Sequence, residues 1–386
     1  MSDPLLPSGM TDARAPHRSA VRAQLPHLTT LRFFAAFWVL GFHSIPRAAD
    51  DGAWNAFWGR GWMGVTFFFV LSGFILAYTY GAHATTVDRR QFWVARVARV
   101  YPLYLFALLF SIPQLWHTVG EFGTQCEVVS GARLAGIVVS SLAMLQAWVD
   151  SWVCVWNCPS WSLSVEAFFY ALFPFLLPLI ATRMGRRFLL IGTIAGLGIS
   201  LSASSGAAVG ALAQEASMSS LNPLARLPEF LLGLWLGGVY LARRPSWTFA
   251  MPLALVAGSA TVALAVWSGM HPAFHAPHLV AAPLFALIVW AVAASPNPSR
   301  GLLAFAPLVL LGESSYALYL LHGPMHGYAL AIFRRVAPGV GSWGVFVLYA
   351  LMTIVVSIAS YRWLEVPSRG WIRGRFAAVR RSTTTG

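Results

Sequence analysis

The chain has 386 residues, of which 58% are hydrophobic and only 10% are charged. A soluble domain carries about 25% charged residues, so this composition excludes a soluble enzyme, and the high hydrophobicity excludes a disordered chain. The formal net charge is +13 and every basic residue is an arginine, which excludes chemistry that needs a lysine. We therefore expect an all-α polytopic membrane protein.

Apolar runs long enough to cross a bilayer alternate with arginine clusters along the chain. The runs are 28–46, 61–80, 100–118, 134–150, 161–180, 188–207, 223–241, 247–268, 278–294, 312–333 and 342–362. The clusters include Arg14, Arg18 and Arg22, then Arg89, Arg90, Arg96 and Arg99, then Arg183, Arg186 and Arg187, and finally Arg243, Arg244, Arg300, Arg362, Arg369, Arg373, Arg375, Arg380 and Arg381. Their spread indicates cytoplasmic loops rather than a nucleic-acid-binding patch.

Placing every arginine cluster in the cytoplasm requires an even number of crossings between neighbouring clusters. Three runs lie between Arg99 and Arg183, and 134–150 is the weakest of them because it contains Gln146 and ends at Asp150. We predict that 134–150 dips into the membrane or lies at its surface. About ten crossings then remain, with both termini in the cytoplasm. The expected division is a cytoplasmic segment 1–27, a transmembrane domain 28–368 and a basic tail 369–386.

The three cysteines, Cys126, Cys154 and Cys158, fall on the outer side of this topology. That side permits disulfides, and an odd number allows at most one pair, which we expect to join Cys126 to Cys154 or to Cys158. A metal site at Cys154 and Cys158 is the weaker alternative because no histidine is near them in the sequence. No metal site is therefore expected.

The first span carries two titratable residues, Arg32 and His43, which are costly inside a bilayer. Their separation puts them on one helix face, about 16 Å apart along the axis. Arg32 lies in the cytoplasmic half and His43 near the outer end. Each alone fits a side chain reaching the headgroups, whereas the shared face favours a lined cavity.

The next two spans contain small and basic residues at notable positions. Ser72 and Gly73 lie mid-membrane, where small residues usually allow close helix packing and less often line a passage. Arg96 and Arg99 lie one turn apart at the cytoplasmic start of the third span. A planar guanidinium is the preferred ligand of phosphate, so this pair fits the phosphates of a soluble donor, or equally lipid headgroups.

Later spans add further polar groups. Glu166 stands at the outer start of a span, where it could pair with His43 and make it a better base, or simply interact with the helix dipole. Arg226 and Glu229 are three residues apart and predict a structural ion pair. Tyr316, Tyr319 and His322 follow at three-residue steps and project to one side of their helix.

Together these segments resemble the acyltransferase-3 family of integral membrane O-acyltransferases. The matching elements, in order along nearly the whole chain, are Arg32 with His43 after ten intervening residues, Phe67 to Phe74, the Arg96, Arg99, Pro102 and Tyr104 element, Trp161 to Glu166, the Ser315, Tyr316, Tyr319, Leu320, His322 and Pro324 element, and Glu365 with Pro367. Some members carry an additional C-terminal SGNH-type domain, and we expect this chain to be a stand-alone transmembrane domain.

The resemblance implies an acyl-CoA-dependent O-acyltransferase in the bacterial cytoplasmic membrane, with no permanently bound cofactor. The donor, commonly acetyl-CoA, would be cytoplasmic, and the acceptor would be a sugar hydroxyl of a surface polysaccharide or lipid-linked glycan. His43 would be the catalytic base or would carry the acyl group, and Glu166 would orient it. The expected substrate-binding residues are Arg32, Ser72, Arg96, Arg99, Tyr104, Tyr316, Tyr319 and His322.

Two other functions fit the same residues. One is an O-acyltransferase whose acceptor is a small glycosylated secondary metabolite, resembling a macrolide. The other is a transporter or flippase, in which intramembrane arginine and histidine would line a pathway. No pair of broken helices recurs in two halves of the sequence, which disfavours the transporter.

Overall fold

The computed structural model describes residues 25–48, 52–81, 87–124, 130–206, 220–243, 245–271, 273–274, 276–296, 301–336 and 339–384. In these ranges the chain forms helices and contains no strand, which confirms the all-α prediction. The predicted positions Cys126, Arg14, Arg18, Arg22, Arg244 and Arg300 lie outside the described residues.

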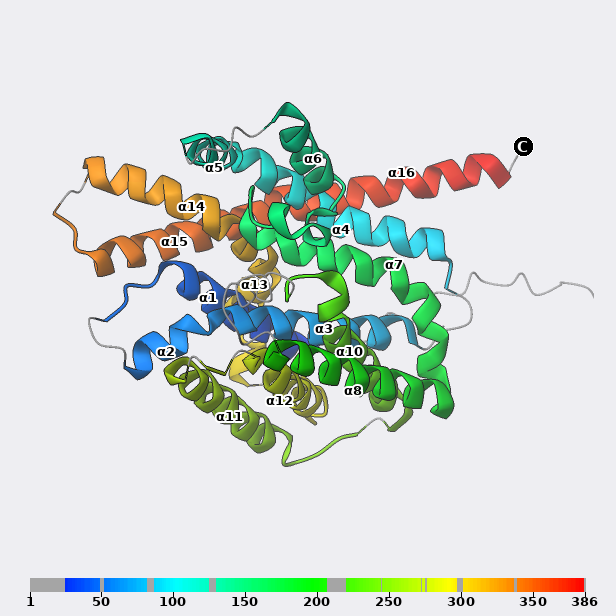
Figure 1. Ribbon diagram of the computed structural model, residues 1–386. Coiled ribbons are helices and arrows are strands. Elements are labelled where there is room, and N and C mark those ends of the chain that lie inside the picture. The colour runs from blue at the N-terminus through cyan, green and yellow to red at the C-terminus, as the bar shows by residue number, and fades with distance from the viewer. Residues whose placement is uncertain are drawn as a thin grey trace, which may run out of the picture.

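Most helices run side by side along one direction, as Figure 1 shows. The first half contains α1 (Pro26–Ser44), α2 (Ala53–Gly59), η1 (Gly61–Met63), α3 (Gly64–Tyr80), α4 (Arg89–Phe110), α5 (Ile112–Thr124), α6 (Gly131–Leu142), η3 (Gln146–Trp148), η4 (Asp150–Trp152), η5 (Cys158–Ser160) and α7 (Trp161–Ala181). The second half contains α8 (Arg183–Gly206), α10 (Pro223–Arg243), α11 (Ala250–Met270), α12 (Pro277–Ala293), η6 (Leu302–Ala304), α13 (Ala306–Glu313), α14 (Ser315–Val336), α15 (Ser342–Ser360), the π-helical turn η7 (Tyr361–Glu365) and α16 (Val366–Thr384).

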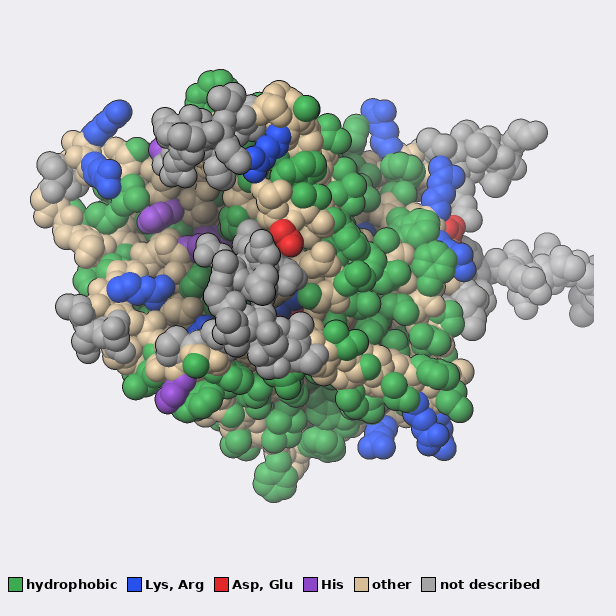
Figure 2. Space-filling view, in the orientation of Figure 1, with side chains coloured by type: hydrophobic (Ala, Val, Ile, Leu, Met, Phe, Trp, Pro, Cys, Tyr) green, Lys and Arg blue, Asp and Glu red, His purple; other side chains and the backbone are tan. Residues whose placement is uncertain are grey.

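Seven helices of the described chain are long and apolar enough to cross a membrane, by length and composition. They confirm a polytopic membrane protein, whereas the count of about ten crossings stays a prediction. Helices α1 and α14 are similar in length to these seven. Their apolar runs are interrupted, however, by Arg32 and His43 in α1 and by His322 in α14. In Figure 2 hydrophobic side chains cover much of the flank of the bundle, and basic side chains gather at its two ends.

Helix α3 is the centre of the bundle and explains how the core is built. Its two glycines, Gly64 and Gly73, are both buried, and α10 packs against it most extensively. A Cβ added at Gly73 would lie 2.3 Å from the carbonyl oxygen of Phe230, and one at Gly233 would lie 2.1 Å from that of Val70. The backbones therefore touch through the two glycines, which is the close packing that Ser72 and Gly73 predict.

Several helix boundaries differ from the predicted spans. The third helix begins at Arg89, where the side chain of Asp88 accepts a hydrogen bond from the amide of Gln91, so Arg96 and Arg99 lie inside α4 rather than before it. The run 134–150 is interrupted, because α6 ends at Leu142 after 12 residues and two 3₁₀ turns follow. A continuous span needs about 20 residues, so this segment is too short to be one.

The run 312–333 is broken at Ser314, between α13 and α14. The hydroxyls of Ser314 and Ser315 donate to the carbonyl oxygens of Leu311 and Gly312 at 3.1 and 2.7 Å, and such local bonds compete with continuation of a helix. At the end of the chain, the expected tail from 369 onwards continues as helix α16 as far as Thr384. Helix α16 packs along α4 and projects beyond the bundle in Figure 1.

Candidate active site

A cavity of about 810 Å³ lies among the helices at the end of the bundle where α4 begins and α16 projects. Its polar lining comes from eight elements: Thr29 and Arg32 of α1, Ser72, Tyr78, Thr79 and Tyr80 of α3, Arg96 and Arg99 of α4, Ser162, Glu166 and Tyr170 of α7, Glu313 of α13, Ser315, Tyr316 and Tyr319 of α14, Tyr361 and Glu365 of η7, and Arg369 of α16. The cavity thus brings together seven of the ten expected site residues.

Hydrogen bonds from α3 and α7 hold the side chain of Glu166 at the cavity wall. The hydroxyl of Ser72 donates to Oε1 of Glu166 at 3.2 Å, and the hydroxyl of Tyr170, one turn along α7, donates to the same oxygen. The expected pairing of Glu166 with His43 is therefore wrong. Glu166 lies in the second turn of α7, on the face that contacts α3 and α4, and its carboxylate points into the cavity rather than toward the end of α1.

Arg96 faces the cavity from an aromatic recess. Its Nη2 atom donates to the hydroxyl of Tyr80 at 3.3 Å, and its guanidinium lies 5.7–5.8 Å from the ring centres of Tyr80, Phe92 and Tyr170. Contacts of this kind hold a guanidinium in place while leaving its remaining N–H groups available. Arg96 is therefore fixed as a cation at the cavity wall, beside Arg99 one turn further along α4.

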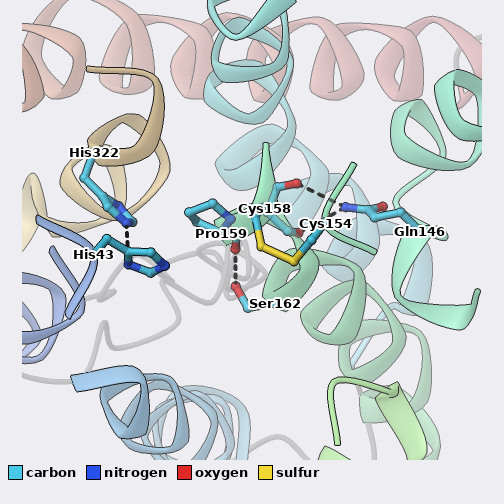
Figure 3. The surroundings of a disulfide bond; sticks show 8 residues. His43, Gln146, Cys154, Cys158, Pro159, Ser162 and His322 are labelled. Carbon is cyan, nitrogen blue, oxygen red and sulfur yellow. Dashed lines mark hydrogen bonds between the residues drawn. A yellow bond between two sulfur atoms is a disulfide. The ribbon is translucent and has the colours of Figure 1, made fainter. Parts of the chain in front are cut away.

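His43 pairs with His322 instead, as Figure 3 shows. His322 is completely buried, and its Nε2 atom lies 3.2 Å from Nδ1 of His43. Nδ1 of His322 lies 2.7 Å from the carbonyl oxygen of Tyr319, so Nδ1 carries the proton and Nε2 of a neutral His322 is an acceptor. Nδ1 of His43 then donates to His322 and to the carbonyl oxygen of Val39 at 3.0 Å, which leaves Nε2 of His43 unprotonated.

The histidine pair is supported by buried polar contacts on both sides. Tyr349 of α15 donates to the carbonyl oxygen of His322 at 2.8 Å, and Nδ2 of Asn157 donates to that of Leu320 at 3.0 Å. Both bonds fix the turn of α14 that carries His322. His43 itself is exposed at the end of α1. The pair therefore combines a buried, fixed imidazole with an accessible one.

Asn157 belongs to a loop closed by a disulfide between Cys154 and Cys158, seen beside Pro159 and Ser162 in Figure 3. The expected pairing of Cys126 with one of these two cysteines is therefore wrong. The two 3₁₀ turns around the loop bring Cys154 and Cys158 together, with a Cα–Cα distance of 4.1 Å. In the described part of the chain, no group of three or more histidine, cysteine or acidic residues could hold a metal ion.

Three expected site residues, His43, Tyr104 and His322, lie outside the lining of the cavity. Tyr104 is fully buried, and its hydroxyl donates to the carbonyl oxygen of Ser141 at 2.5 Å and accepts from Nε2 of Gln146. These contacts join α4 to the segment after α6 and give Tyr104 a structural role. Tyr319 adjoins both regions, since it lines the cavity and its ring centre lies 6.0 Å from that of His322.

The sequence interpretation missed Tyr170, Glu313, Tyr361, Glu365 and Arg369 as lining residues. Tyr170 could have been found, since it follows Glu166 by four residues on one helix face. Arg369 was attributed to the basic tail, and only the fold shows that it turns inward. The ion pair of Arg226 and Glu229 is confirmed, with a distance of 2.7 Å between Nη1 and Oε1, and the hydroxyl of Thr66 donates to the same carboxylate oxygen.

Comparison of the sequence with known proteins identifies a matching family. Residues 26–362 match the family model described as an acyltransferase domain, acyltransferase 3. Acyltransferase MdmB of Streptomyces mycarofaciens is 30% identical over 78% of both chains. O-acetyltransferase OatA of Staphylococcus aureus is 24% identical over 89% of this chain and 57% of its own length. The putative peptidoglycan O-acetyltransferase YrhL of Bacillus subtilis is 26% identical over 92% of this chain and 56% of its own. No solved structure matches the chain.

Proposed function

Since the chain belongs to the acyltransferase-3 family, we propose that it takes an acyl group from acyl-CoA and transfers it to a sugar hydroxyl at the outer side of the membrane. The acyl group is acetyl, the group named for OatA and YrhL. The acceptor is a surface polysaccharide or a lipid-linked glycan. The membrane is the cytoplasmic membrane of a bacterium.

One observation carries this proposal: Tyr319 lines the basic cavity, and its ring centre lies 6.0 Å from that of His322 in the imidazole pair. Arg32, Arg96 and Arg99 give the cavity the cations that the phosphates of coenzyme A need. The thioester end of the donor enters past Ser72 and Glu166 toward Tyr319. The acceptor hydroxyl approaches the exposed His43 from the other side.

In the proposed reaction, Nε2 of His43 removes the proton of the acceptor hydroxyl as its oxygen attacks the thioester carbonyl. The carbon–sulfur bond breaks, the new ester bond forms, and the departing thiolate of coenzyme A takes the proton from His43. His322 holds His43 in the tautomer that has a free Nε2. Glu166 and Ser72 line the donor path, and Tyr316 and Tyr319 bound it from α14.

The test uses purified protein in detergent with radiolabelled acetyl-CoA and a panel of glycan acceptors. We expect His43→Ala to reduce transfer by about 10²–10⁴-fold while the protein still inserts and binds coenzyme A. Full activity in His43→Ala would remove the base from the mechanism. Transfer in detergent needs no gradient, so it also separates the enzyme from a transporter, which would show none.

A second acceptor class has a specific observation in its favour. MdmB is 30% identical to this chain, against 24% for OatA and 26% for YrhL, and the name of MdmB specifies no polysaccharide. A small glycosylated secondary metabolite is therefore the alternative acceptor. The same acceptor panel decides, when macrolide glycosides are included beside cell-wall glycan fragments.

A further inference from the structure

The π-helical turn η7 and the first turn of α16 direct three residues into the cavity. Tyr361, Glu365 and Arg369 follow one another at four-residue steps, so they share one helix face, and all three line the cavity. The turn Tyr361–Glu365 is π-helical, a rare form that occurs frequently at functional sites. After the apolar helix α15, the chain therefore presents a polar face to the cavity. Arg96 and Arg99 of α4 line the same cavity.

Glu365 and Arg369 form an ion pair that is incompletely satisfied. Glu365 is 4% exposed, and its Oε2 atom lies 3.5 Å from Nη2 of Arg369. The other carboxylate oxygen of Glu365 and Nε of Arg369 are buried and have no hydrogen-bond partner among the described residues. Buried polar atoms are nearly always paired in native structures, so these two atoms indicate that a polar group can bind between α16 and its neighbours.

The charges around this point favour an anion. The ionisable residues that line the cavity are Arg32, Arg96, Arg99 and Arg369 against Glu166, Glu313 and Glu365, together with six tyrosines. Glu166 already accepts bonds from Ser72 and Tyr170. Helix α16 packs along α4, so Arg369 and Arg99 approach the cavity from two adjacent helices. Guanidinium groups converging from two helices match the several oxygens of a phosphate.

We propose that Arg369 binds a phosphate group of the acyl-CoA donor, with Glu365 as the positioning residue that keeps its guanidinium directed into the cavity. The inference rests on the proposed function and extends the donor site from α1 and α4 to the C-terminal helix. It also distinguishes Arg369 from the other arginines of α16. Arg373, one turn further along, is exposed and outside the cavity lining, as expected of a residue that only sets topology.

The experiment measures binding of coenzyme A to the full-length protein in detergent by isothermal titration calorimetry. We expect Arg369→Ala to weaken binding at least tenfold, a loss typical of a charge-assisted hydrogen bond. Arg369→Lys keeps the charge and should recover part of the affinity. Arg373→Ala removes the same charge from the exposed face and should change the dissociation constant less than about twofold.

Because Arg369→Ala leaves a buried carboxylate unpaired, a second comparison avoids that strain. The double variant Glu365→Gln with Arg369→Gln replaces the ion pair by two amides, which can bond to each other. It should bind coenzyme A at least tenfold more weakly than Glu365→Gln alone. Equal affinity in these two proteins, or equal effects of Arg369→Ala and Arg373→Ala, would overturn the role of Arg369. Absence of binding to the wild-type protein would instead contradict the proposed donor.

Discussion

At the scale of single residues, the histidine pair shows how a buried imidazole can fix the state of an accessible one. His322 has only one tautomer compatible with the carbonyl oxygen of Tyr319, because a carbonyl cannot donate. That tautomer presents an acceptor to His43 and so keeps the proton of His43 on Nδ1. In the proposed reaction, His322 would therefore fix the tautomer of His43, as the carboxylate of a Ser-His-Asp triad does for its histidine.

This arrangement predicts the effect of His322→Asn. The asparagine amide can still donate to the carbonyl oxygen of Tyr319, but it has no acceptor that reaches His43. We expect kcat to fall by about 10²-fold, with KM for acetyl-CoA unchanged because the arginines line the cavity and His322 does not. The measurement is steady-state transfer from labelled acetyl-CoA.

His326 offers a matched control one turn further along α14. It packs against the ring of Tyr349 at 5.2 Å, and among the described residues no hydrogen bond joins it to His43 or His322. His326→Asn should therefore change kcat by less than about threefold, within the usual effect of a substitution away from a site. If kcat fell to a similar extent in both variants, the effect would come from the packing of α14 rather than from the tautomer of His43.

The residue identities were largely readable from the sequence, whereas their pairings were not. Arg32, Arg96, Arg99 and Glu166 were expected at a site because charges inside spans are costly, and all four line the cavity. The partner of His43 depends on which helices meet in space, and α1 contacts α14. No pattern along the chain shows that contact, so a carboxylate was expected where the structure has an imidazole.

At the scale of elements, the contact of α3 with α10 holds the cavity wall in place. Gly73 and Gly233 let the two backbones touch, and Ser72, next to Gly73, bonds to Glu166 of α7. Apolar runs predicted these helices well because hydrophobicity and length decide insertion. The breaks at Leu142 and Ser314 and the π-helical turn were not predictable, because side-chain bonds and packing set them rather than hydropathy.

Gly73→Ala tests the role of this contact. The new Cβ would lie 2.3 Å from the carbonyl oxygen of Phe230 and 2.8 Å from the amide nitrogen of Leu234, both backbone atoms that cannot rotate away. We expect a loss of about 1–3 kcal/mol in stability, as for other overpacked sites, and a lower melting temperature by fluorimetry in detergent.

Gly258 of α11 serves as the matched control, because a Cβ there meets nothing within 4 Å. Alanine is the better helix former by about 1 kcal/mol, so Gly258→Ala should leave the melting temperature unchanged or raise it. If Gly73→Ala melted like Gly258→Ala, the two helices would not be in backbone contact.

At the scale of the whole molecule, the proposed reaction needs the cavity and the histidine pair to face opposite sides of the membrane. By the positive-inside rule, the arginine clusters would put the cavity end in the cytoplasm, where the proposed donor would be found. This orientation also requires that the segment from α6 to η4 does not cross, since one added crossing would reverse the side of every helix after it. The short α6 agrees with this requirement.

Cysteine accessibility tests the orientation directly. In a background with all three native cysteines replaced by serine, Ser151→Cys in η4 and Ser246→Cys between α10 and α11 each place one thiol at an exposed position. We expect a membrane-impermeant maleimide to label Ser151→Cys in intact cells and Ser246→Cys only after permeabilisation. The reverse pattern would turn the arginine-lined cavity toward the outside, where coenzyme A is absent, and the donor proposed for this cavity would then be wrong.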